Sequence, residues 1–327
     1  MNAKRAAIIY NPVARRLSRT RHLLQRTIET LAKQGIEVEL VATTAPGNAS
    51  VQARRQIENG CDLILAAGGD GTINEVANGM LYSNVPLGIL PGGTANVLAR
   101  ELRLSMDMTH VAARMGSFQP VRISVGALRR GELEKRCFLC MSGAGLDAEI
   151  VYNLNLDLKA ALGKLAYYLC GFAQAFRPLH EFGLTIDGRP YRASFALISR
   201  VRNYGGDLEI ARGASLLSNH FEVVLFRGVR SIRYIPYLLA VMAGQANRMP
   251  GVTVVRGCSV TCDPEEGQDI YSQIDGELAG KLPMTAEIIP DALTLLAPPE
   301  YLAKERTLVS RTWGSGADEG VRPTVLS

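Results

Sequence analysis

The stretch CDLILAAGGDGTINEVANGM, from Cys61 to Met80, decides the fold of this chain. It contains a short apolar run, Leu63–Ala67, of the kind that a parallel strand buried on both faces requires. Gly68–Gly69 let the backbone approach a ligand, and Asp70–Thr72 lead into a helix predicted over Ile73–Met80. The first amides of a helix have no internal partners and its dipole adds positive charge there, so this junction predicts a phosphate site.

A second glycine turn follows one strand-and-helix unit later. The segment PLGILPGGTANVLAREL, Pro86–Leu102, predicts a strand over Leu87–Leu90, a turn at Pro91–Gly93 and a helix starting near Thr94. In a doubly wound parallel sheet, consecutive strands bring their carboxyl ends to one edge, so both turns can face one crevice. The pair predicts a polyphosphate site in a doubly wound α/β domain.

The rest of the chain divides into two predicted domains. Strands and helices alternate over residues 1–120, with further elements at Ala6–Tyr10, Ser18–Lys33, Glu37–Ala42 and Asn48–Ile57. Residues 121–297 are richer in strands with short polar turns, which predicts a mostly antiparallel second domain. Its predicted strands are Val121–Leu128, Lys135–Ser142, Gly183–Ile186, Ala193–Ser199, Phe221–Phe226, Thr253–Cys262 and Leu293–Ala297.

Helical patterns complete this division. Two helices, Leu158–Phe176 and Ile232–Asn247, interrupt the second domain. A helix near Tyr301–Val309 is expected to return residues 298–312 to the first domain. The polar tail over residues 313–327 is expected to be disordered.

Bulk properties limit the partners. The 327 residues are enough for two domains, and the 47% hydrophobic content supports sizeable cores. The sequence contains no run of about 18 or more apolar residues, which a helix needs to span a bilayer. A cytoplasmic protein is therefore expected. The net charge of +5 comes without a long basic block, so a nucleic-acid partner is not expected. An anionic membrane surface, contacted peripherally from the inner face, is the more natural partner.

The glycine segments GGDGTINEVANG and LGILPGGTANVLAR together resemble the diacylglycerol kinase catalytic family, which also holds sphingosine and ceramide kinases and bacterial soluble lipid kinases. Four further segments agree in order, namely IIYNP at Ile8–Pro12, SGAGLDAEI at Ser142–Ile150, NYGGDLEIARGASLLSN at Asn203–Asn219 and QIDGELAG at Gln273–Gly280. The resemblance covers about Ala6 to Pro299. It implies an ATP-binding α/β domain, a β-sandwich second domain and transfer of the γ-phosphoryl group of ATP to a primary hydroxyl of a membrane lipid.

Diacylglycerol heads the substrates that this resemblance implies, and ceramide, sphingosine, monoacylglycerol and phosphatidylglycerol stay open. Because NAD kinases share GGDGT, an NAD kinase-like phosphotransferase is one alternative. A lipid- or nucleotide-binding regulator without turnover is another. A homodimer is left open by the sequence.

The resemblance also implies a nucleotide site, and the strand ends agree with it. The implied contacts are Asn11, Thr43, Gly68, Gly69, Asp70, Gly71, Thr72, Ile73, Asn74, Gly93 and Thr94. Because two anions repel, a carboxylate at Asp70 makes sense in a phosphate turn if it holds Mg²⁺ or its waters. The alternative role for Asp70 is a helix cap.

The acceptor hydroxyl requires a base, and Asp275-Gly276-Glu277 is the candidate segment. Two carboxylates separated by glycine on an extended segment point to the same side. The resemblance assigns acceptor activation to this segment and leaves open which carboxylate is the base, so Asp275 and Glu277 join Asp70 as candidate catalytic residues. The alternative is an ordinary Asp-Gly β-turn.

One segment departs from the family pattern. Relatives commonly carry an acidic residue at the position of Asn219, where it binds a structural magnesium with carbonyls that correspond to about Leu216 and Phe221. An amide brings no negative charge, on which a hard divalent cation depends. We therefore expect this second-domain site to be weak or empty and its loop to be held by hydrogen bonds.

Overall fold

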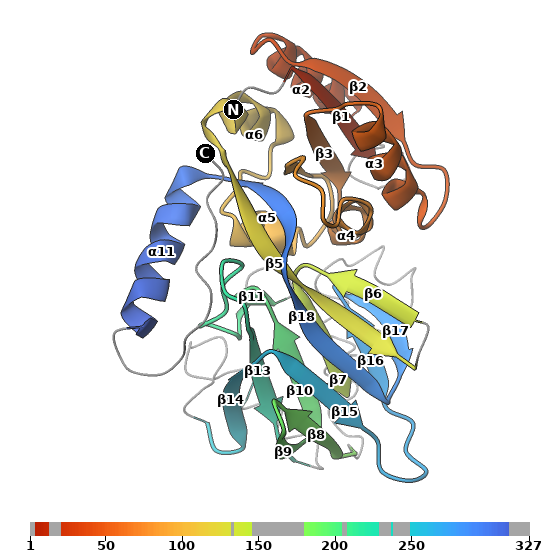
Figure 1. The fold of residues 1–327 in the computed structure, drawn as a ribbon, viewed down its shortest axis with the longest axis vertical. Helices are drawn as coiled ribbons and strands as arrows, with labels where there is room; N and C mark the ends of the chain where they lie inside the picture. The colour runs from red at the N-terminus through yellow and green to blue at the C-terminus, as the bar shows by residue number, and fades with distance from the viewer. Residues whose placement is uncertain are drawn as a thin grey trace. The chain divides into compact units, whose positions relative to one another are not determined.

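The computed structural model describes residues 4–12, 21–131, 134–145, 180–204, 208–228, 237 and 249–313. The chain divides into two compact units (Figure 1). Unit 1 comprises Met1–Val125, Leu216–Asn219 and Ile289–Ser327, and unit 2 comprises Gly126–Ser215 and His220–Ile288. The boundaries differ from residues 120 and 298 because strands β5 (Gln119–Arg130) and β18 (Met284–Ala297) each run from one unit into the other.

Unit 1 is built on four parallel strands in the order β2-β1-β3-β4. These strands are β1 (Arg5–Tyr10), β2 (Glu37–Ala42), β3 (Leu63–Gly68) and β4 (Leu87–Pro91). Every residue of β3 and β4 is buried, as expected for parallel strands covered on both faces. The end of β18 extends this sheet in parallel, where Leu295 pairs with Leu87. The predicted α/β architecture is confirmed.

Helices connect the strands of unit 1. They are α2 (Arg21–Ala32), α3 (Asn48–Glu58), α4 (Asp70–Gly79), α5 (Val97–Glu101), α6 (Met108–Arg114), the 3₁₀ helix η1 (Met115–Ser117) and α11 (Pro299–Trp313). Helices α3 and α4 pack backbone to backbone, since a Cβ on Gly79 would lie 2.1 Å from the carbonyl oxygen of Ser50. The helix predicted near Thr94 begins only at Val97, because the preceding residue, Asn96, has a left-handed φ of 51°.

Unit 2 is a β-sandwich, as predicted. One sheet has six antiparallel strands in the order β14-β13-β10-β7-β16-β17, and the other pairs β18, β15, β8 and β9, with β5 beside β18 and β6. The strands are β6 (Glu134–Phe138), β7 (Met141–Gly145), β8 (Phe182–Ile186), β9 (Arg189–Ala193), β10 (Phe195–Ser199), β13 (Phe221–Phe226), β14 (Val252–Gly257), β15 (Ser259–Asp263), β16 (Tyr271–Ile274) and β17 (Glu277–Lys281). Side chains from both sheets share one core, in which the rings of Phe138 and Phe221 stack 5.7 Å apart. A short ribbon pairs β11 (Asn203–Tyr204) with β12 (Leu208–Glu209).

Two predicted strands are each split in two, which corrects the sequence analysis. The segment 135–142 breaks at Leu139–Cys140 between β6 and β7, and the segment 253–262 breaks at Cys258 between β14 and β15. At the first break, backbone N–H groups donate to the carboxylate of Asp275. At the second, they donate to the carboxylate of Asp187. A side chain more than 70 residues away thus replaces the local strand ladder at each break.

Three predictions fall on parts of the chain outside the described residues. They are the helices Leu158–Phe176 and Ile232–Asn247, apart from Tyr237, and the tail beyond Trp313. Among the residues that are described, no helix has the length and apolar character needed to cross a membrane.

Candidate functional site

The predicted nucleotide residues of unit 1 gather at the carboxyl edge of its parallel sheet. The pairing register aligns Tyr10 with Ala42 and with Ala67, and aligns Gly68 with Pro91. Residues that directly follow these strands, namely Asn11, Thr43, Gly69 and Gly92, therefore emerge along one edge. The structure brings together what the strand pattern predicted.

The two glycine turns touch each other at this edge. The amide of Gly92 donates to the carbonyl oxygen of Gly68 at 2.8 Å. A Cβ on Gly93 would lie 2.4 Å from the Cα of Gly69, and a Cβ on Gly68 would lie 2.7 Å from the Cβ of Thr72. Glycine at these positions therefore lets the two turns pack directly against each other and lets the Thr72 side chain pack against Gly68.

Asn96 shapes the second turn and was missed by the sequence analysis. Its Oδ1 accepts from the amide of Gly93 at 2.8 Å, and its Nδ2 donates to the Gly93 carbonyl oxygen at 2.9 Å. The residue is 1% exposed and its backbone is left-handed, a conformation that asparagine tolerates better than most residues. The asparagine three positions after the second glycine was the available signal.

Asp70 begins α4 and connects it to α5. Its Oδ1 accepts from the amide of Leu98 at 3.3 Å, so the carboxylate serves the first turn of another helix and does not act as the N-cap of its own. Burial raises the pKa of Asp70, and the backbone N–H groups of Leu98 and Val97 offset part of this effect. An ionised carboxylate here is costly without a counter-charge, which suits a residue that meets a cation.

The other predicted nucleotide residues differ in access. Thr94 is exposed, while Gly71 and Thr72 are partly exposed. Ile73 and Asn74 are buried, and the amide of Ile73 already donates to the Gly69 carbonyl oxygen inside α4. The open part of this helix start is therefore Asp70–Thr72.

The Asp275-Gly276-Glu277 segment is a hairpin turn, so the expected extended arrangement is wrong. Ile274 pairs directly with Glu277, which leaves Asp275 and Gly276 as a two-residue loop. Their φ values are 48° and 82°, as in a type I′ turn, for which Asp-Gly is a favoured sequence. The two carboxylates consequently do not lie on one side of an extended strand.

The two carboxylates of this turn have different surroundings. Asp275 accepts from the amides of Leu139, Cys140 and Met141 at 3.2, 3.1 and 2.8 Å. Glu277 forms an ion pair with Arg136, and its side chain is 50% exposed. Asp275 is thus held by the backbone, whereas Glu277 is within reach of a ligand.

A second hairpin repeats the arrangement of Asp275. Asp187 and Gly188 form the two-residue loop between β8 and β9, with φ values of 45° and 81°. The Asp187 carboxylate accepts from the amides of Cys258 and Ser259 at 2.9–3.1 Å. Two Asp-Gly loops of the same conformation therefore accept the backbone hydrogen bonds at these two strand breaks of unit 2.

The predicted metal residues do not provide a favourable cation site. Asn219 Oδ1, the atom that would face a cation, accepts from Ser124 Oγ at 2.6 Å. The ligands expected from Leu216 and Phe221 are backbone carbonyl oxygens, which carry no formal charge, and both residues are buried. Over the ranges that the structure describes, no three His, Cys, Asp or Glu side chains gather in a way that could hold a metal ion. This amide and hydroxyl pair brings no negative charge, so the segment does not fit a structural magnesium.

The chain is similar to known proteins in sequence and in fold. Residues 5–128 match the model of the diacylglycerol kinase catalytic domain, and residues 141–297 match the YegS C-terminal NAD kinase beta sandwich-like domain. The chain is 31% identical over 289 residues to a diacylglycerol kinase of Bacillus subtilis (strain 168), which covers 86% of this chain and 92% of that protein. It is 26% identical over 307 residues to a diacylglycerol kinase of Staphylococcus epidermidis (strain ATCC 12228 / FDA PCI 1200), covering 92% and 95%. In fold it is similar to the crystal structure of a diacylglycerol kinase from Bacillus anthracis str. Sterne, with a TM-score of 0.74, 22% identity and coverage of 92% and 99%.

Proposed function

Because this chain belongs to the diacylglycerol kinase family and is a lipid kinase, we propose that it transfers the γ-phosphoryl group of ATP to the primary hydroxyl of diacylglycerol. The names of its relatives support diacylglycerol as the acceptor. The observation that carries the proposal is the pair of touching glycine turns at the sheet edge with Asp70 beside them. Such turns leave backbone amides as the phosphate contacts, and phosphoryl transfer depends chiefly on positioning and charge neutralisation.

Unit 1 would supply the nucleotide contacts. The first amides of α4, at Gly71 and Thr72, and the hydroxyl of Thr72 face the polyphosphate in this proposal. The amides of Gly92 and Gly93 already donate to the Gly68 carbonyl oxygen and to Asn96 Oδ1, so they hold the second turn in shape beside this site. Asn11 and Thr43 contact the remainder of the nucleotide from the same sheet edge. Asp70 would hold Mg²⁺, which when bound neutralises negative charge on the phosphates. The raised pKa of Asp70 is consistent with this role, because a neighbouring cation would stabilise the ionised form.

Unit 2 would supply the base. We assign proton acceptance to Glu277, because its carboxylate is half-exposed and, within the described part of the chain, is held by the side chain of Arg136. Asp275 acts as a positioning residue that fixes the turn through three backbone amides. The acceptor hydroxyl must come within hydrogen-bond reach of Glu277, and its proton can leave late in a loose transition state.

The test is a phosphoryl-transfer assay with γ-labelled ATP and purified full-length protein. The acceptors are diacylglycerol, monoacylglycerol, ceramide, sphingosine and phosphatidylglycerol in mixed micelles, with NAD as a further acceptor. We expect diacylglycerol to give the highest kcat/KM. Glu277→Gln should lower kcat by about two to four orders of magnitude, with little change in ATP affinity.

Three results would overturn parts of this proposal. Transfer to NAD would favour the phosphotransferase alternative, to which the name of the matching second-domain family points. Binding of ATP and lipid without transfer to any acceptor would favour a regulator. Full activity of Glu277→Gln would remove that carboxylate from the mechanism.

A further inference from the structure

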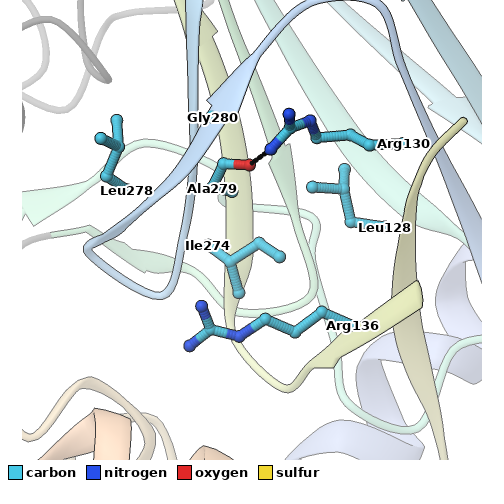
Figure 2. A pocket seen from close by; sticks show the side chains of 7 residues that line it. All are labelled: Leu128, Arg130, Arg136, Ile274, Leu278, Ala279 and Gly280. Atoms are coloured by element: carbon cyan, nitrogen blue, oxygen red, sulfur yellow. Dashed lines mark hydrogen bonds between the residues drawn. The ribbon is translucent and has the colours of Figure 1, made fainter. Parts of the chain in front are cut away.

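A cavity of about 220 Å³ lies in unit 2 next to the turn that carries Glu277. Figure 2 shows its walls, which come from the β5–β6 hairpin and the β16–β17 hairpin. Leu128 and Ile274 form an apolar wall, and Leu278 stands at its edge with 42% of its surface exposed. Arg130 and Arg136 line the same cavity and lie on opposite sides of that wall in this view.

Both arginines join one hairpin to the other. Arg130 donates to the carbonyl oxygen of Ala279 on β17, as the dashed line in Figure 2 marks. Arg136, which pairs across the β5–β6 ladder with Leu128, forms its ion pair with Glu277. A guanidinium carries five N–H donors in a planar fork, more than one carboxylate oxygen can use. A ligand held by Arg136 would therefore sit directly beside the candidate base.

The size and chemistry of the cavity restrict what it can bind. Its volume of about 220 Å³ lies below the roughly 300–1,000 Å³ of sites for drug-sized ligands, so it suits a compact head group. Its arginines donate hydrogen bonds to oxygen acceptors and repel a protonated amine. Its aliphatic side chains suit the first methylene groups of an acyl chain.

We propose that this cavity binds the ester-bearing glycerol head of the acceptor lipid, with Arg136 donating to an acyl ester carbonyl oxygen. This inference rests on the proposed function and names the part of the substrate that unit 2 selects. Arg136 then has two partners, the Glu277 carboxylate in the free protein and the ester carbonyl when lipid is bound. It is the residue that favours acylglycerols over acceptors that lack an acyl carbonyl.

The test compares acceptors that differ only in the ester. Dioctanoylglycerol and its dioctyl ether analogue carry the same hydroxyl, but the ether has no carbonyl oxygen. Wild-type kcat/KM should be roughly tenfold to a hundredfold higher for the diester, the range expected for one hydrogen bond to a charged group. Sphingosine, with its ammonium group and no acyl carbonyl, should be the poorest acceptor.

The Arg136→Met variant separates recognition from a structural role. It should abolish the ester preference, so that the ratio of kcat/KM for the diester to that for the diether falls to about one. The readout is this ratio, because loss of the ion pair with Glu277 changes the absolute rate for both acceptors. The matched control is Arg129→Met on the other strand of the same β5–β6 hairpin, because Arg129 pairs with Glu287 and does not line the cavity. This control should keep the full ester preference. Arg136→Lys, which retains one charged donor group, should keep part of it.

Several outcomes overturn the inference. It fails if the wild-type kcat/KM is the same for diester and diether, or if it is highest for sphingosine. It also fails if Arg136→Met lowers kcat/KM for both glycerol acceptors by the same factor. The ester preference of wild type is decisive even if Arg136→Met does not fold, since no variant is needed to measure it. Absence of transfer to both glycerol acceptors would instead refute the proposed function, so the two failures are distinguishable.

Discussion

Replacing Gly93 by alanine should destabilise unit 1 through a clash that can be located atom by atom. The added Cβ would lie 2.4 Å from the Cα of Gly69 and 2.9 Å from Oδ1 of Asn96. One atom belongs to the backbone, and the other belongs to the Asn96 amide group, which is fixed by two hydrogen bonds to Gly93, one through Oδ1 and one through Nδ2. The two turns must separate to admit the methyl group, at a cost of about 1–3 kcal/mol for overpacking.

Gly69→Ala provides the matched control, because it adds the same methyl group to the facing turn. Its nearest neighbour would be the Cα of Gly93 at 3.4 Å, which is close to an ordinary van der Waals contact. The φ and ψ of Gly69, −85° and 179°, suit alanine. Loss of glycine's freedom in the unfolded chain should then make this variant neutral or slightly more stable, by up to about 1 kcal/mol.

Urea unfolding at equilibrium, followed by far-UV circular dichroism, measures the difference between the two variants. The midpoint should fall for Gly93→Ala and stay near wild type for Gly69→Ala, with similar m values. ATP affinity should fall in both, because each methyl group is added where the two turns that we assign to the phosphate site meet. Equal stability of the two variants would refute the close contact between the turns, and unchanged ATP affinity in both would refute its role.

Four further substitutions, in three predictions, have defined outcomes. Asp70→Asn should lower kcat by at least about two orders of magnitude while raising the stability of the nucleotide-free protein at pH 7, both measured on one preparation. Asp275→Asn and Asp187→Asn should each lower the free energy of unfolding by about 1–3 kcal/mol, because each weakens bonds from backbone amides to a charged carboxylate. Asn219→Asp should create tighter magnesium binding than wild type, measured by calorimetric titration without nucleotide.

The pH dependence of Asp70 follows from the direction of its pKa. Burial raises that pKa, so the folded protein holds the proton more tightly than the unfolded chain does. The resulting contribution to stability is present at low pH, below the pKa of the unfolded chain, and is lost as the pH rises through the folded pKa. Asp70→Asn should therefore gain most over wild type above that range, and a loss of stability there would contradict the assignment.

The other two predictions have equally direct contradictions. One contradicting result is that Asp275→Asn abolishes turnover at unchanged stability while Asp187→Asn lowers stability as predicted. Asp275 would then take part in the reaction instead of stabilising the turn. A tight magnesium site in wild type, with chelation lowering its melting temperature and no gain from Asn219→Asp, would show that the amide does not cost the site its metal.

Local patterns predicted the parts of the fold that depend on burial. Strand β3 extends the predicted Leu63–Ala67 by one residue, β4 extends the predicted Leu87–Leu90 by one residue, and both strands are wholly buried. The gathering of the predicted nucleotide residues at one sheet edge was also predictable, because parallel strands bring their carboxyl ends together whatever their side chains are. The sequence did not predict the bonds from Asp275 to residues 139–141, which are 134–136 positions away. Such contacts depend on the packing of two sheets, which no local pattern records.

The two Asp-Gly loops of unit 2 explain how a turn needed for folding came to carry a candidate base. In both loops the aspartate fastens a neighbouring strand break, so the aspartate is accounted for by the fold alone. The residues that follow differ, since Gly188 precedes Arg189 at an exposed hairpin and Gly276 precedes Glu277 beside the arginine-lined cavity. The tight turn fixes the direction of the next side chain, because Glu277 is paired with Ile274 across the ladder. Function at this hairpin therefore depends on the position after the loop, and the Asp-Gly pair acts as its rigid support.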